Sequence, residues 1–203
     1  MGISIKKISI SPGFLLLISA LCIFTSGEFL AAAALAIVIH EMGHFAAIKL
    51  CGGKIKKIYM QTAGFAIEYG GILSYRKEAI AAVSGPIASA ALAVSMSYLA
   101  KSAQSEFLYL LSGISFSFAV FNILPVLPLD GGRAAFAVIA GKFDIFTAER
   151  ILCILSCAVA FVLLVCGTYL LFYTGNNPTL LIVAAWMLIS YCKRSGNVIK
   201  LRQ

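Results

Sequence analysis

The sequence has few charged residues. Asp, Glu, Lys and Arg make up 12% of its 203 residues, whereas soluble domains carry about 25%. Hydrophobic residues make up 61% of the chain, which excludes an ordinary soluble domain. No linker, internal repeat or low-complexity segment divides the chain, so we expect residues 1–203 to form a single domain. The composition favours a protein whose apolar residues face lipid as well as one another.

Acidic residues are scarcer than basic ones, with 8 Asp and Glu against 16 Lys and Arg and a formal net charge of +8. A basic excess can indicate nucleic-acid binding, but the sequence lacks a basic helix and an aromatic stacking platform. The basic residues instead flank apolar segments, which is typical of membrane proteins. We therefore expect the lipid bilayer as a partner, and no nucleic acid.

The sequence also lacks a CxxC pair. Five of its six cysteines lie within the apolar segments given below or at the end of one, where a free cysteine behaves as a small hydrophobic residue. We therefore expect the cysteines to pack in the core and not to form a second metal site.

The apolar residues fall into six segments that we expect to cross the membrane as helices. The first segment is short for a hydrocarbon layer of about 30 Å. Flanking residues must extend this helix, or the bilayer must be thinner around it. Thr147 is a candidate N-cap before the fifth segment. The six segments are residues 14–25, 29–51, 79–100, 107–127, 151–173 and 178–191.

Short alternating runs predict strands outside these segments. Residues 3–11 alternate apolar and polar side chains, which is typical of a short strand on the membrane surface. Residues 52–78 are glycine-rich and basic, and the runs 57–61 and 64–69 within them predict β-hairpins. The expected fold class is an all-α polytopic membrane protein with six transmembrane helices and short β-hairpins at the cytoplasmic membrane surface.

The basic residues also predict the orientation of the chain. Six crossings place both termini on one side of the membrane. With the N-terminus in the cytoplasm, fifteen of the 16 basic residues lie in cytoplasmic segments and Lys101 alone lies outside. The positive-inside rule therefore predicts that both termini are cytoplasmic.

The second apolar segment contains the motif His40-Glu41-Met42-Gly43-His44. On a helix the two histidines, four residues apart, lie on one face, where both rings can reach one zinc ion. Zinc lowers the pKa of water to about 7, and Glu41 is placed to accept the proton. The alternative is a chance match in a helix that lines a polar cavity, but ionisable groups at membrane depth usually have a function.

A catalytic zinc usually has three protein ligands, so the histidine pair needs a third. Asp130 is the best candidate, because it ends an apolar segment and follows Pro125 and Pro128, which break the helix. In the predicted topology it lies at the same depth as the histidines. The alternative is an ordinary turn aspartate in a Leu-Asp-Gly-Gly sequence.

Three motifs together resemble the site-2 proteases, which are intramembrane zinc metalloproteases of peptidase family M50. They are HEMGH at 40–44, NILPVLPLDGG at 122–132 and GPIAS at 85–89. The six-segment layout is most similar to the branch of stage IV sporulation protein FB, without the CBS domain of that branch. There is no PDZ insertion, so we expect no periplasmic gating of substrates by such a domain.

The resemblance implies hydrolysis of peptide bonds within or next to transmembrane segments of membrane-tethered substrates, as in regulated intramembrane proteolysis. His40, His44 and Asp130 would bind one Zn²⁺ per chain, and Glu41 would be the catalytic base. The resemblance also implies a bacterial cell membrane as the location, and it is compatible with a membrane regulatory partner.

Substrate contacts are expected at three residues. Asn122 matches the polar residue of the family's aspartate segment, where it would contact substrate or bond to carbonyls freed by Pro125 and Pro128. Phe65 and Ile67 lie in the run 64–69, which would offer a strand edge to an extended substrate. The alternative for this run is a hairpin that only covers the membrane surface.

Two other functions fit the sequence less well. Membrane zincins that cleave soluble or prenylated substrates take a glutamate from a later helix as third ligand, and the later apolar segments contain no acidic residue. A non-proteolytic metal-binding scaffold or transporter would have ligands on several helices and no base beside them, whereas Glu41 is in place.

Overall fold

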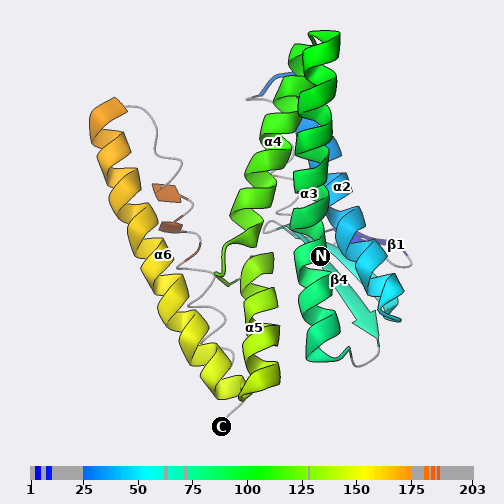
Figure 1. Cartoon of the computed structure of the whole chain (residues 1–203), viewed down its shortest axis with the longest axis vertical. Helices are drawn as coiled ribbons and strands as arrows, with labels where there is room; N and C mark the ends of the chain where they lie inside the picture. Colours follow the sequence, from blue (N-terminus) through cyan, green and yellow to red (C-terminus); the bar gives the residue numbers. More distant parts are fainter. Residues whose placement is uncertain are drawn as a thin grey trace. The chain divides into compact units, whose positions relative to one another are not determined.

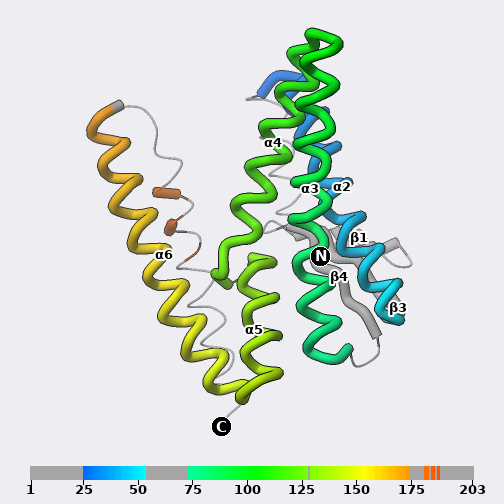
Figure 2. The backbone as a smooth tube through the Cα atoms, viewed as in Figure 1, coloured from blue at the N-terminus to red at the C-terminus, as the bar shows by residue number. Residues whose placement is uncertain are grey.

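The computed structural model describes residues 3–5, 8–10, 25–61, 64–70, 73–127, 129–174, 181–182, 184–185 and 187. Two compact units divide the chain, Met1–Asn122 and Ile123–Gln203. The course of the chain through both units can be followed in Figures 1 and 2. Each unit is described by itself.

Two long helices dominate the first unit and run side by side, α2 (Gly27–Leu50) and α3 (Tyr75–Ala103) (Figure 1). The hydroxyl of Ser26 caps α2 by accepting a 3.3 Å hydrogen bond from the amide of Phe29. At the other end of α2, the ammonium of Lys77 donates a 2.9 Å bond to the carbonyl of Cys51. Helix α3 continues through Pro86.

Small side chains let the helices of the first unit pack closely. A Cβ added to Gly43 of α2 would lie 2.5 Å from the carbonyl oxygen of Ser84 in α3. Helix α4 (Glu106–Ile123) contributes Leu111 to a core in which Ala32 and Ala36 of α2 are fully buried. The close crossing of α2 and α3 brings the backbone of α3 to the histidine motif.

A four-stranded sheet completes the first unit, in the order β1 (Ile3–Ile5), β2 (Ile8–Ile10), β3 (Lys54–Gln61) and β4 (Gly64–Gly70). Strands β1 and β2 are antiparallel, β2 and β3 are parallel, and β3 and β4 are antiparallel. The expected runs 57–61 and 64–69 fall within β3 and β4. The single strand expected over residues 3–11 is instead two strands paired with each other.

The second unit contains α5 (Asp130–Lys142) and α6 (Ile145–Thr174), which pack together. The amide of Leu127 donates a 3.2 Å hydrogen bond to the hydroxyl of Ser156 in α6. Gly131 and Gly132 press against the backbone just before α5: a Cβ on Gly132 would lie 2.7 Å from the amide nitrogen of Leu127. This close approach fixes how the chain enters α5.

The structure corrects the sequence reading of residues 123–150. The helix expected over 107–127 ends at Ile123, and α5 was not predicted at all. Helix α6 begins at Ile145 and not at 151, and its cap is Asp144 and not Thr147. The carboxylate of Asp144 accepts a 2.8 Å bond from the amide of Thr147 and a 2.7 Å bond from its hydroxyl. These bonds hold the pKa of the exposed Asp144 below its ordinary value of 3.8.

Four of the described helices, α2, α3, α4 and α6, are long and apolar enough to cross a membrane. They correspond to the segments expected at 29–51, 79–100, 107–127 and 151–173. The segment expected at 14–25 lies outside the described residues except for Thr25, and so does most of 178–191. The count of six crossings, like the side on which the termini lie, stays a prediction.

Candidate metal centre

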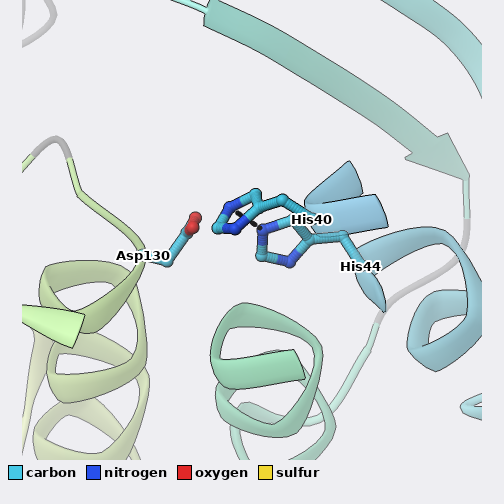
Figure 3. A group of neighbouring side chains, drawn as sticks. All are labelled: His40, His44 and Asp130. Carbon is cyan, nitrogen blue, oxygen red and sulfur yellow. Dashed lines mark hydrogen bonds between the residues drawn. The ribbon is translucent and has the colours of Figure 1, made fainter. Parts of the chain in front are cut away.

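His40 and His44 lie one helical turn apart in α2, and both side chains are buried, with 5% and 7% of their surface exposed. Their Nε2 atoms are 3.2 Å apart and the rings meet edge to face (Figure 3). Two nitrogens on a tetrahedral zinc, each about 2.0–2.1 Å from the metal, would be roughly 3.3 Å apart. The spacing of the two Nε2 atoms therefore fits a shared zinc ion.

The other ring nitrogen of each histidine faces α3. Nδ1 of His44 donates a 2.8 Å hydrogen bond to the carbonyl oxygen of Ala81, because a carbonyl can only accept. A neutral His44 then has its lone pair on Nε2, as a metal ligand must. Nδ1 of His40 lies 2.9 Å from the hydroxyl oxygen of Ser89. Both rings are thus held in the way that zinc-binding histidines usually are.

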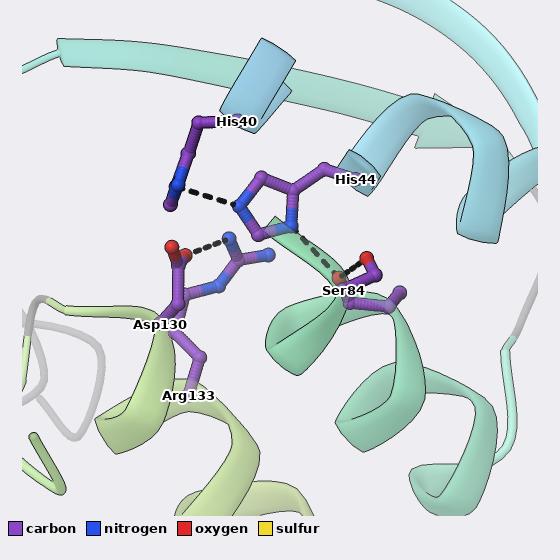
Figure 4. Close-up of polar contacts among 6 residues, drawn as sticks. His40, His44, Ser84, Asp130 and Arg133 are labelled. Atoms are coloured by element: carbon purple, nitrogen blue, oxygen red, sulfur yellow. Dashed lines mark hydrogen bonds and ion pairs between the residues drawn. The ribbon is translucent and has the colours of Figure 1, made fainter. Parts of the chain in front are cut away.

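The first turns of α3 surround this pair with small residues. The hydroxyl of Ser84 donates a 2.7 Å bond to the same Ala81 carbonyl that holds His44 (Figure 4). Gly85 lies directly against the His44 ring, and a Cβ there would lie 2.6 Å from Cε1 of the ring. The ring needs this space, which only glycine leaves.

Glu41 lies between the two histidines in α2 and is half-buried. Successive residues are about 100° apart around a helix. The side chain of Glu41 therefore projects from α2 next to the face that carries the two histidines, and not from that face itself. This position is compatible with the expected base, while the role itself stays a prediction.

In the second unit, Asp130 is the first residue of α5 and is 9% exposed. Its carboxylate lies at the N-terminus of a helix, where unpaired amides and the helix dipole favour negative charge. Oδ1 lies 3.6 Å from a guanidinium nitrogen of Arg133, one turn further along α5 (Figure 4).

His40, His44 and Asp130 each carry an atom that can bind a metal (Figure 3). The histidines belong to the first unit and Asp130 to the second. That the three residues form one metal site is a proposal.

The structure gives the hydrogen-bond partner of Asn122 and the strand pairing of Phe65 and Ile67, while their contact with substrate stays a prediction. The Asn122 amide donates a 3.1 Å bond to the carbonyl of Phe118, one turn earlier in α4, and not to the carbonyls freed by the prolines. The backbone of Phe65 and Ile67 lies in β4, paired with Met60 and Ile58. Strand β4 is at the end of the sheet order, as an edge strand must be.

Sequence reasoning missed the partners of the two rings. Ser89 ends the GPIAS motif at 85–89, and a polar side chain in an apolar helix can signal a buried hydrogen bond. A backbone carbonyl such as that of Ala81 leaves no signal in the sequence.

Comparison with known proteins gives consistent results. The sequence model of Peptidase family M50 matches residues 67–166. A zinc metalloprotease of Methanocaldococcus jannaschii is 28% identical over 141 residues, which are 64% of this chain and 40% of that protein. Stage IV sporulation protein FB of Bacillus subtilis is 28% identical over 192 residues, which are 92% of this chain and 64% of that protein. The chain thus spans less than two thirds of either relative.

A solved structure is also similar. The site-2 protease from Methanocaldococcus jannaschii superposes with a TM-score of 0.69 at 21% identity, covering 95% of this chain and 94% of that one. At this identity the likeness establishes a common fold.

Proposed function

The chain belongs to peptidase family M50, and from this premise we propose that it is an intramembrane zinc metalloprotease of the site-2 type. Its apolar helices make it an integral membrane protein. The observation that carries the proposal is the buried pair of histidines, whose Nε2 atoms are 3.2 Å apart. Histidine side chains are rare among apolar helices unless they have a function, so a bound ion is the simplest reason for this pair.

His40, His44 and Asp130 hold one zinc ion per chain in this proposal. Two neutral imidazoles and one carboxylate form a donor set typical of catalytic zinc, which keeps a fourth position open for water. The spacing of the two Nε2 atoms supports the histidine pair, and the burial of Asp130 at the start of α5 supports the third ligand. Arg133 balances the charge of Asp130 from outside the donor set.

Zinc bound here would supply a Lewis acid and would lower the pKa of a water molecule to about 7. The carboxylate of Glu41 would accept a proton from this water while the water oxygen attacks the carbonyl carbon of the scissile peptide bond. The same carboxyl then gives the proton to the leaving nitrogen as the C–N bond breaks.

The substrates we propose are membrane-tethered proteins cut within or next to a transmembrane segment. A helical segment hides its carbonyls in its own hydrogen bonds, so the substrate must be extended before cleavage. Strand β4 lies at the edge of the sheet and offers replacement partners for an extended backbone. Phe65 and Ile67 of β4 would then flank the substrate, and Asn122 is a further candidate contact.

A comparison of cells that carry the wild type or Glu41→Gln tests the function. Membrane fractions and released fragments are analysed by quantitative proteomics. A protease should produce fragments, cut near a membrane segment, that are absent in the variant. Identical fragment sets in the two strains would favour a metal-binding scaffold or transporter without proteolysis.

A further inference from the structure

Ser89 bonds to a side chain of another helix, unlike Ser95, Ser115 and Ser117. The hydroxyls of Ser95, Ser115 and Ser117 donate to the carbonyl four residues earlier in their own helix, as serine commonly does inside helices. The hydroxyl of Ser89 in α3 lies instead 2.9 Å from Nδ1 of His40 in α2. This bond joins two helices and ends on a proposed zinc ligand.

Burial makes this bond important. Ser89 has no exposed surface, and His40 is only 5% exposed. Water therefore cannot easily take the place of the hydroxyl if it is removed. A buried polar side chain costs free energy unless it is hydrogen-bonded, so the serine and the ring depend on each other.

The chemistry of the bond matches what a zinc ligand needs. A neutral His40 presents a lone pair at Nε2 only if its hydrogen is on Nδ1, and the serine oxygen can accept that hydrogen. The bond also opposes rotation of the ring away from His44. The carbonyl of Ala81 has the same effect on His44, but a backbone group cannot be removed by substitution.

We propose that Ser89 is the positioning residue of the metal site: it sets the tautomer and the orientation of His40 so that Nε2 faces Nε2 of His44. This inference rests on the proposed zinc site. It assigns to Ser89, which is not itself a ligand, an influence on how His40 binds the metal. Hydrogen bonds of this kind typically change metal affinity by about 10- to 100-fold.

Ser89→Ala in the full-length protein tests the inference, with Ser115→Ala as the control. Both serines are fully buried in helices of the first unit, but Ser115 bonds to Leu111 in its own helix. Zinc affinity is measured by competition with a chelating dye on protein purified in detergent. Visible spectra of the Co²⁺-loaded proteins then report the ligand geometry, and melting curves show that each variant is folded.

Ser89→Ala should bind zinc about 10- to 100-fold more weakly than the wild type and should change the Co²⁺ spectrum. Ser115→Ala should match the wild type in both. Wild-type zinc affinity in Ser89→Ala would overturn the inference, and so would equal weakening in both variants, which would indicate a general packing effect. A wild type that binds no zinc would instead reject the proposed function.

Discussion

Gly85→Ala should abolish zinc binding although residue 85 is not a ligand. A Cβ at this position would lie 2.6 Å from Cε1 and 2.7 Å from Cδ2 of His44, and closer still to Nε2. Ordinary van der Waals contact begins at 3.4 Å. The ring of His44 must therefore retreat, and it must weaken its hydrogen bond to the Ala81 carbonyl to do so.

The required displacement sets the size of the effect. Moving the ring to van der Waals distance shifts its atoms by about 1 Å, whereas a zinc–nitrogen bond of about 2.0–2.1 Å tolerates roughly 0.2 Å. His44 would then no longer bind the metal. Since loss of a partner outside the ligand set already costs about 10- to 100-fold in affinity, we expect a loss above about 100-fold. Alanine favours helix over glycine by about 1 kcal/mol, so α3 itself should persist.

Zinc titration of purified Gly85→Ala measures this effect, with Gly113→Ala as the matched control. Gly113 is also in a helix of the first unit, but a Cβ there meets nothing within 4 Å. The control should bind zinc normally and melt at the same or a higher temperature. Wild-type zinc affinity in Gly85→Ala would refute the reasoning, because the ring would have found room without leaving the metal.

Three further changes test other parts of the account. Asp130→Ala should weaken zinc binding by more than about 100-fold while the chain stays inserted in the membrane. Unchanged zinc content would show that another residue is the third ligand. Acid should destabilise the start of α6, because the bonds to Thr147 lower the pKa of Asp144. The stabilisation of this helix end is complete above pH 3.8 and is lost as the pH falls through the lower folded-state pKa of Asp144. Hydrogen exchange at the Thr147 amide follows this loss, and the same acid response in Asp144→Asn would contradict it. Ile67→Pro should bind zinc but cleave poorly, since proline removes a backbone donor from β4, whereas Ile67→Val should be active; equal cleavage by both would show that β4 does not hold the substrate.

The closeness of His40 and His44 could be predicted from the sequence because it is a local property of a helix. Residues four apart lie on one face whatever the helix packs against. The four apolar helices were predictable for a similar reason, since their length and composition are read directly from the chain. The family resemblance, carried by three short motifs, is confirmed by the comparisons.

Helix α5 could not be predicted because its first turn contains Gly131 and Gly132, which disfavour helix in isolation. Their value lies in packing, since each presses against backbone that precedes the helix. The sequence also places the start of α6 too late. It offers Thr147 as the cap, whereas the stronger capping carboxylate of Asp144 lies three residues before it. The partners of the histidine rings depend on how α2 and α3 cross, which local patterns do not contain.

The central claim is that Glu41 activates water at a zinc ion held by other residues. Zinc content and cleavage of a membrane-tethered peptide are measured on the same preparations of wild type and Glu41→Gln, reconstituted in liposomes. The account predicts about one zinc per chain in both proteins, with cleavage by the wild type alone. Cleavage by Glu41→Gln at the wild-type rate, or loss of its zinc, would contradict it.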